Sequence, residues 1–452
     1  MEKTLFAVRK TIMSYVKAGN PLIVATILAL VAANLPVVSD YYFNFWNEEI
    51  SLKIGDFNLF GHGDSTMNLM TFINDALMAI FFFTIGLEIK REVLVGELSS
   101  LRQALLPIIA AIGGMVVPIV IFHFLSVGED YSRGAAIPMA TDIAFSLGVL
   151  AMLGSRVPIS LKIFLTTLAV VDDIGGILVI ATCYTSEIHF NFLLYAGVAI
   201  VFLILGNIWK IQTKMYYILF GLMVWYCFLN SGIHPTIAGV IVAFCIPAVP
   251  VFNPKKYIQI IRRSISHFPT ESDAQLDSSN LILTSTQMDW LKQIESASDK
   301  VISPLQDLED TLHPLVNFII IPLFAFANAG ISIDGMQMSD ITSGVGLAVV
   351  CGLVIGKFLG IFSFTWLSVR LRLAPMPYRA TWKMIGAVSV LGGIGFTVSL
   401  FIANLSFPDA GHQEMLNASK LGILVGSLIS AVLGFMLLNL LLPKRDKASA
   451  EE

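Results

Sequence analysis

Long apolar segments recur along this chain at a length that can cross a lipid bilayer, and this feature restricts the fold more than any other. A helix needs about 20 predominantly apolar residues to span the hydrocarbon core. Twelve such segments occur in the 452 residues, near 18–37, 67–88, 103–125, 133–153, 158–182, 190–208, 215–230, 232–250, 314–332, 342–368, 381–405 and 417–442. The composition is 56% hydrophobic and only 13% charged, which is not typical of a soluble protein. We therefore expect an all-α, multi-pass membrane protein, with residues 1–452 forming a single transmembrane domain.

The basic residues orient the predicted helices, because cytoplasmic loops of membrane proteins carry an excess of lysine and arginine. If both termini and every even-numbered loop are cytoplasmic, 24 of the 28 lysines and arginines lie on that side. Three lie on the opposite side (Lys53, Arg133 and Lys420), and the remaining one, Lys357, lies inside a span. The sequence thus predicts twelve transmembrane helices with both termini in the cytoplasm.

Two loops are predicted to have structure of their own. EEISLKIGDFNLFG, residues 48–61, alternates polar and apolar residues around Gly55-Asp56, which is typical of a β-hairpin, here on the extracytoplasmic surface. We expect residues 45–60 to form either a homodimer contact or an ordinary surface loop. Residues 253–312 form a long cytoplasmic insert. Its flanks have the pattern of amphipathic helices that lie on membrane lipid, and its middle, PTESDAQLDSSN, has a disordered composition.

A few ionisable residues interrupt the predicted spans. They are Asp75, Asp142, the adjacent pair Asp172 and Asp173, and Lys357, with Glu88 at the end of its span. Each charge at the centre of a bilayer helix costs about 2.5–3.5 kcal/mol on insertion scales, so such residues usually mark an ion pathway. Adjacent side chains on a helix point about 100° apart. One acid of the pair can therefore face a water-filled cavity, while the other faces a neighbouring helix where a lysine could pair with it.

Two spans also contain residues that break helices. GAAIPMATDIAFSLG, residues 134–148, carries Pro138 and the polar pair Thr141-Asp142, and AVSVLGGIGFTVSLFI, residues 387–402, carries three glycines. Unwound backbone at membrane depth is tolerated where it lines a protein cavity. The breaks fall in the fourth and eleventh spans, the middle helices of spans 3–5 and 10–12. An offset of seven spans reverses the orientation, so the pattern predicts inverted repeats of a transporter.

Many of these motifs together resemble the NhaA family of bacterial sodium/proton antiporters. The matching segments include NDALMAIFFFTIGLEIKRE (74–92), AIPMATDIAFSLGVLAMLGSRVP (136–158), LKIFLTTLAVVDDIGGI (161–177), IGKFLGI (355–361) and GGIGFTVSLFIA (392–403). The resemblance implies that the two broken helices cross near the membrane midplane. The link between interrupted helices and inverted repeats is itself known in part from this family, so the helix breaks do not test the resemblance independently.

The resemblance implies a role for each unusual residue. Asp172 and Asp173 correspond to the family's sodium- and proton-binding carboxylates, and Asp142 to the acid at the helix crossing, with Thr141 beside it. Lys357 corresponds to the lysine that pairs with the first acid of the pair. Asp75 lies on the outward pathway. The residues linked with pH response are Glu88, Glu92, Glu309 and His313 on the cytoplasmic side and His234 on the other.

A carboxylate suits such an exchange because it is both a hard oxygen ligand and a proton acceptor, so sodium and protons compete for it. The resemblance implies electrogenic, pH-regulated exchange of cytoplasmic sodium or lithium for a larger number of external protons. This exchange would maintain internal pH and sodium across a bacterial inner membrane. A sodium-coupled carrier of an organic anion is the alternative on the same architecture.

Other functions are not expected. An intramembrane aspartyl protease needs its acids on separate helices, and GGIGF lacks the aspartate that should follow, so we do not expect an enzyme. The nucleotide-binding pattern GxxxxGK[ST] does not occur, no basic patch suggests nucleic acid, and the four cysteines lack metal-ligand spacing. We therefore expect no cofactor and no metal other than the transported ion.

Overall fold

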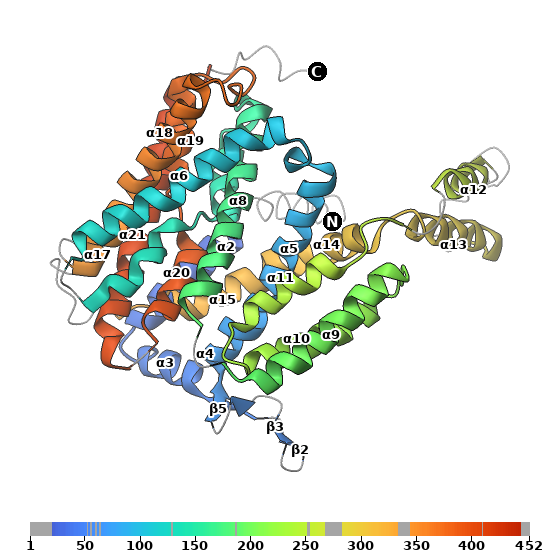
Figure 1. Cartoon of the computed structure of the whole chain (residues 1–452), viewed down its shortest axis with the longest axis horizontal. Coiled ribbons are helices and arrows are strands. Elements are labelled where there is room, and N and C mark those ends of the chain that lie inside the picture. The colour runs from blue at the N-terminus through green and yellow to red at the C-terminus, as the bar shows by residue number, and fades with distance from the viewer. Residues whose placement is uncertain are drawn as a thin grey trace, which may run out of the picture.

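The computed structural model of the chain is mostly helical (Figure 1). It describes residues 20–51, 53–54, 57–58, 61–62, 65–127, 130–185, 188–250, 254–266, 283–332, 344–408 and 410–443. Within these residues, 7 helices are long and apolar enough to cross a membrane, or up to 10 if each of three bent helix pairs is one span. Two shorter apolar helices, Lys214–Leu229 and Pro235–Cys245, accompany them. The chain is therefore a helical membrane protein, as the sequence predicted.

The helices divide into two groups by their packing. The crossing group contains the two broken spans and the helices packed on them. Its members are α6 (Leu101–Leu125), η3 (Asp130–Met139), α7 (Ile143–Met152), α8 (Ile159–Cys183), α17 (Gly344–Cys351), η6 (Gly352–Gly356), α18 (Lys357–Arg370), α19 (Trp382–Leu391), α20 (Phe396–Ser406) and α21 (Gln413–Leu441). Short 3-10 turns lie at η2 (Glu97–Ser99), η4 (Gly154–Arg156) and η7 (Ala410–His412).

The flanking group packs beside the crossing group. Its members are α2 (Asn20–Asn34), α4 (Leu69–Phe72), η1 (Ile73–Leu77), α5 (Met78–Val95), α9 (Phe190–Ile208), α10 (Lys214–Leu229), α11 (Pro235–Cys245), α14 (Pro304–Leu315), η5 (Val316–Ile320) and α15 (Ile321–Asn328). The most extensive helix contacts are made within a group: α18 packs on α6 in the crossing group, and α11 packs on α5 in the flanking group. The two groups therefore differ in their densest helix pairs, although one buried apolar cluster, with Phe82 and Phe324 on one side and Phe122 and Phe401 on the other, runs across their boundary.

Glycines allow α6 to approach closely both α18 and η6, the segment that precedes α18. A Cβ added to Gly113 would overlap the carbonyl oxygen of Gly360, and one added to Gly356 would lie 2.8 Å from the Cα of Pro118. Small residues are the usual means of close helix packing inside membranes, where lipid supplies no hydrophobic drive. This contact matters for the site because Lys357 follows Gly356 directly on α18.

Both predicted breaks are present, and they meet each other. Helices η3 and α7 are bent by 42° and α19 and α20 by 46°. The backbone N–H of Asp142, in the first break, donates to the carbonyl oxygen of Ile394, in the second, over 2.7 Å. Interrupted backbone groups that lack helical partners thus bind each other, which removes the cost of burying them unpaired.

The segment between α2 and α4 differs from the single hairpin that the sequence predicted. Residues 39–47, part of the predicted loop, form the helix α3 (Ser39–Asn47), bent by 110° from α2. Five short strands follow: β1 (Glu49–Ile50), β2 (Lys53–Ile54), β3 (Phe57–Asn58), β4 (Gly61–His62) and β5 (Ser65–Asn68). Strands β2 and β3 pair antiparallel, and a second sheet has the order β1-β5-β4. The aromatic run Tyr41 to Trp46 explains α3, because Tyr42 and Trp46 share a buried face. Gly55 and Asp56 lie outside the described residues.

The long insert contains two helices that pack on each other, α12 (Pro254–Ser266) and α13 (Ser285–Asp299). They extend away from the other helices at one side of the molecule (Figure 1). Thr284 and Gln287 form a capping box that begins α13. The predicted disordered stretch, residues 269–280, lies outside the described residues.

Candidate ion-binding site

The adjacent acids Asp172 and Asp173 lie in the middle of α8 and are both buried, at 1% and 4% exposure. The Nζ of Lys357 donates to Oδ2 of Asp172 over 2.5 Å, and the Oγ1 of Thr141 donates to the same oxygen over 2.6 Å. Thr141 comes from the first helix break and Lys357 from α18. Asp172 therefore joins three separate elements of the crossing group.

Lys357 is fully buried, with no exposed side-chain surface. A charge without water needs a partner of opposite sign, and Asp172 supplies it. The lysine reaches Asp172 because α18 packs tightly on α6. The side chain of Lys357 passes Gly114 of α6, where an added Cβ would lie 3.7 Å from its Cδ.

Asp142 binds the N-terminal ends of two helices. Its Oδ1 accepts from the backbone N–H of Phe145 over 3.0 Å, so Asp142 is the N-cap of α7. Its Oδ2 accepts from the backbone N–H of Thr397, in the first turn of α20, over 3.2 Å, and from the Thr397 hydroxyl over 2.7 Å. Helix N-termini carry partial positive charge, so one buried carboxylate compensates two of them.

A cavity of about 470 Å³ reaches this region between the two groups. Asp173, Asp142, Thr141 and Thr397 line its inner part, whereas Asp172 does not line it. Among the described residues, the Oδ1 atoms of Asp172 and Asp173 have no hydrogen-bond partner. The two acids therefore differ in surroundings: Asp172 is held by protein groups, and Asp173 meets the cavity.

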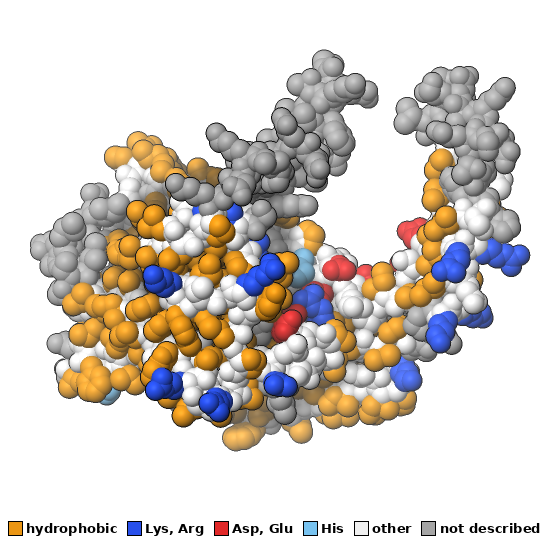
Figure 2. Space-filling model, turned by 90° about the horizontal axis from the view of Figure 1, so that it is seen from above, with side chains coloured by type: hydrophobic (Ala, Val, Ile, Leu, Met, Phe, Trp, Pro, Cys, Tyr) orange, Lys and Arg blue, Asp and Glu red, His pale blue; other side chains and the backbone are white. Residues whose placement is uncertain are grey.

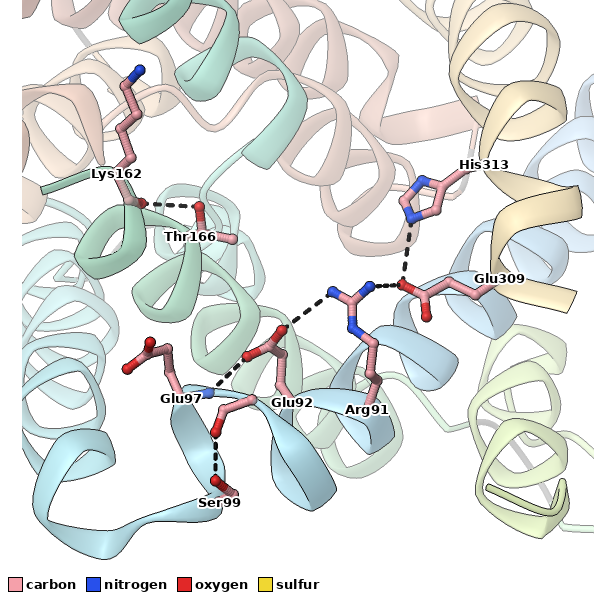
Figure 3. A network of polar contacts seen from close by, with 9 residues as sticks. Arg91, Glu92, Glu97, Ser99, Lys162, Thr166, Glu309 and His313 are labelled. Atoms are coloured by element: carbon pink, nitrogen blue, oxygen red, sulfur yellow. Dashed lines mark hydrogen bonds and ion pairs between the residues drawn. The ribbon is translucent and has the colours of Figure 1, made fainter. Parts of the chain in front are cut away.

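Glu88 and His313 line the same cavity, and His313 also belongs to a network of charged side chains at its mouth. Figure 3 shows Arg91 of α5 between two glutamates. Its guanidinium lies 2.6 Å from Oε1 of Glu309 and 3.2 Å from Oε1 of Glu92. Nε2 of His313 lies 3.6 Å from Oε1 of Glu309. The Glu309 side chain is almost completely buried. Figure 2 shows acidic, basic and histidine side chains gathered in a hollow of the surface.

The remaining two predicted residues lie apart from the cavity lining. Asp75 lies in η1, and its backbone carbonyl accepts from the Trp225 indole N–H over 3.1 Å. His234 is the N-cap residue of α11, with its ring 6.2 Å from that of Phe401. Neither residue joins the Arg91 network.

Sequence reasoning missed several residues near the site. Thr397 binds Asp142 but was read only as part of a glycine-rich break, and Arg91 was counted only as a loop charge. Lys420, which the charge count places on the extracytoplasmic side, lies inside α21 and is buried, at 6% exposure. An inward-facing position on a helix cannot be distinguished from a loop end when the residue lies near the start of an apolar run.

The described residues also contain three π-helical segments, which no pattern in the sequence predicts. They are η1, which holds Asp75, η5, which begins three residues after His313, and η6, which ends immediately before Lys357. Such segments often occur at functional sites, because the extra residue in the turn shifts the side chains that follow.

Within the described residues, no group of three or more His, Cys, Asp and Glu side chains is arranged to hold a metal ion. The oxygens available to a cation at the crossing are those of the carboxylates and of Thr141 and Thr397, a donor type that suits hard cations. Buried carboxylates beside a cavity, at the meeting point of two broken helices, define the class of ion-coupled secondary transporters.

Comparisons with known proteins assign a family within this class. The family model described as Na+/H+ antiporter 1 matches residues 9–438. A protein of Phocaeicola vulgatus named Na(+)/H(+) antiporter NhaA is 50% identical over 444 residues, covering 97% of both chains. Relatives of the same name in Bacteroides fragilis and Escherichia coli are 54% and 43% identical, covering 95% and 92% of this chain and 97% and 94% of theirs. The chain belongs to the Na+/H+ antiporter 1 family.

Proposed function

We propose that this protein exchanges cytoplasmic sodium or lithium for a larger number of external protons, at a site formed by Asp172 and Asp173. Family membership and the names of the relatives support sodium/proton antiport. They give no support to the alternative, a sodium-coupled carrier of an organic anion. The observation that carries the site is that Asp173 lines a cavity at the helix crossing, next to an acid paired with a buried lysine.

The exchange follows from competition at the carboxylates. A sodium ion entering the cavity meets the Asp173 carboxylate, and the free Oδ1 of Asp172 lies on the neighbouring residue. A proton on either carboxyl removes the negative charge that attracts sodium. Each ligand therefore displaces the other, and a scaffold that exposes the site alternately to both sides couples their gradients without a separate device.

Lys357 has the role of compensating charge in this cycle. Sodium bound to both acids would weaken the ion pair that Lys357 makes with Asp172. Protons that enter in excess over sodium carry net positive charge inward, so the membrane potential drives the exchange. One elementary charge crossing 100 mV supplies about 2.3 kcal/mol.

We extend the proposal to topology and regulation. The 10 spans that result when each bent pair is one span, together with the two shorter apolar helices, add up to the proposed twelve. Both termini would lie in the cytoplasm of a bacterium, with the protein in the inner membrane and spans 3–5 and 10–12 as inverted repeats. In this orientation the cavity mouth, with Glu88, Glu92, Glu309 and His313, faces the cytoplasm and responds to pH. Asp75 and His234 would face the opposite, outward side of the membrane.

Everted membrane vesicles test the function directly. A pH gradient is established across vesicles that contain the protein, and sodium, lithium or potassium is then added over a range of pH. We expect sodium and lithium to dissipate the gradient, with a rate that rises across a defined pH interval. Absence of any cation-driven proton movement in vesicles with verified protein would contradict the function. Dissipation that requires an organic anion would favour the alternative carrier.

A further inference from the structure

Three asparagines form a chain of hydrogen bonds across three helical segments. Nδ2 of Asn404, in α20, donates to Oδ1 of Asn328 over 2.8 Å. Nδ2 of Asn328, the last residue of α15, donates in turn to Oδ1 of Asn74, in η1, over 2.9 Å. Asn328 is completely buried, and Asn74 and Asn404 are half-buried. We refer to Asn404, Asn328 and Asn74 as the asparagine ladder.

The ladder joins the two helix groups. Asn404 belongs to the crossing group, whereas Asn328 and Asn74 belong to the flanking group. By contrast, the side-chain bonds around Asp142 and Asp172 stay within the crossing group, and those around Arg91 stay within the flanking group. The ladder therefore reports directly on the position of one group relative to the other.

Helix α20 connects the ladder to the ion site. Thr397 lines the cavity, Phe401 follows four residues later, and Asn404 three residues after that, so the three lie along one face. The Phe401 ring is fully buried, 5.7 Å from that of Phe82 and 6.4 Å from that of Phe324, both in the flanking group. A layer of rings and then the ladder thus lie beyond the site, on the side away from Glu88 and His313.

We propose that the asparagine ladder is the closing contact of the outward route and that it must break each time the site opens toward Asp75, the residue after Asn74. The inference rests on the proposed function, since alternating access moves one helix group against the other. Neutral amides suit this role. Their bond is modest in net free energy, yet a buried amide left unpaired is unfavourable, so the closed state is favoured without being fixed.

Cross-linking in reconstituted full-length protein tests the proposal. The four native cysteines, Cys183, Cys227, Cys245 and Cys351, are first replaced by serine, and Asn328→Cys and Asn404→Cys are then introduced together. A short bifunctional methanethiosulfonate links the two thiols in vesicles. We expect sodium-driven proton movement to fall in proportion to the cross-linked fraction and to return on reduction. Exchange at an unchanged rate in fully cross-linked protein would overturn the proposal.

Asn207 supplies the matched control. Its Nδ2 donates to the carbonyl oxygen of Cys245 over 2.8 Å, which joins α9 to α11 inside the flanking group. Asn207→Cys with the native Cys245 retained, cross-linked in the same way, should keep its activity. Exchange by the unmodified and the reduced proteins tests the proposed function, which fails if none of them exchanges sodium for protons. The role of the ladder is tested separately, by the change in exchange rate that cross-linking causes.

Single substitutions test the same contact without reagents. Asn404→Ala removes the bond between the groups, and Asn207→Ala removes one amide bond within a group. We expect faster deuterium uptake over residues 398–406 in Asn404→Ala than in Asn207→Ala, because the outward route opens more often. Equal uptake over these residues in the two variants would also overturn the proposal.

Discussion

At the scale of single residues, Asp172 and Asp173 are consecutive in the chain yet meet different surroundings. The turn of a helix directs Asp172 toward Thr141 and Lys357 and Asp173 toward the cavity. Two identical side chains can therefore take different roles, one held in an ion pair and one open to the transported ion.

Asp173→Asn should abolish exchange, because an amide cannot take up a proton and binds sodium more weakly than a carboxylate. Asp172→Asn should impair exchange severely. Both are measured as sodium-driven proton movement in vesicles with verified protein content. Strong exchange in protein that carries both asparagines would mean that the transported ions bind elsewhere.

Asp142→Asn should retain partial exchange with a raised apparent sodium constant or a shifted pH profile, and it should lower thermal stability. The reason is that asparagine can still accept one hydrogen bond but no longer compensates the N-termini of α7 and α20. Asp142→Glu, which keeps the charge, should also remain partly active. Melting temperature and vesicle exchange are measured together, with Asp173→Asn as the stable but inactive comparison. A fully stable, wholly inactive Asp142→Asn would instead place Asp142 in the ion-binding set.

Lys357→Arg should be tolerated better than Lys357→Ala. Arginine keeps the positive charge beside Asp172, whereas alanine leaves a buried carboxylate unpaired, which costs about 3–5 kcal/mol of unfolding free energy. Reversal potentials measure the coupling ratio of the arginine variant. We expect the wild-type ratio if the lysine only compensates charge. A changed ratio would show that Lys357 releases a transported proton, because arginine stays protonated.

At the scale of elements, the helix pair α12 and α13 is attached to the transport domain without contributing to the cavity. Its attachment points lie close together, because the N–H of Leu305, at the start of α14, donates to the carbonyl oxygen of Pro247, just after α11, over 3.3 Å. The chain can therefore be closed across this short gap when the pair is removed.

Deletion of residues 256–300 should leave exchange intact, because none of them that the structure describes lines the cavity and the Leu305–Pro247 bond holds the junction. We expect the deletion to change only the pH midpoint of exchange or the amount of protein in the membrane. Exchange in vesicles is compared at equal protein content, with membrane insertion verified. Complete loss of exchange in a correctly inserted deletion would show that the insert controls entry to the cavity.

At the scale of the whole molecule, strands β2 and β3 project from one end of the helical body (Figure 1). A two-stranded hairpin is marginally stable by itself, so a second copy is a suitable partner for the strand edges that β2 and β3 do not use in pairing with each other.

We propose that this hairpin is a homodimer contact. Replacement of residues 52–60 by a short glycine linker should then convert the dimer into a monomer while each protomer continues to exchange sodium for protons. The site residues all lie within one chain, so transport does not need the second copy. Light scattering of purified protein measures the oligomeric state. The variant without residues 256–300 is the control and should remain dimeric. A glycine-linker variant that is still dimeric would locate the interface on another surface.

Much of the site was readable from the sequence, because its elements are visible one segment at a time. A charged residue in an apolar run is conspicuous, so the sequence predicts Asp142, Asp172, Asp173 and Lys357 as site residues, and the structure places all four near the helix crossing. Proline and glycine likewise marked the two helix breaks correctly. These signals are local: each depends on the free energy of placing one residue in lipid or in a helix.

The tertiary structure alone decided which of these residues meet. The pairing of Lys357 with Asp172 spans 185 positions and the Thr397–Asp142 bond spans 255. The asparagine ladder and the π-helical turns were likewise invisible, since asparagine is unremarkable in sequence and an extra residue in a turn depends on neighbouring helices. The sequence by itself determined that charges had to be buried and where helices had to break. Which charge neutralises which was decided by helix packing, because partners brought together from distant segments leave no periodicity or spacing in the chain.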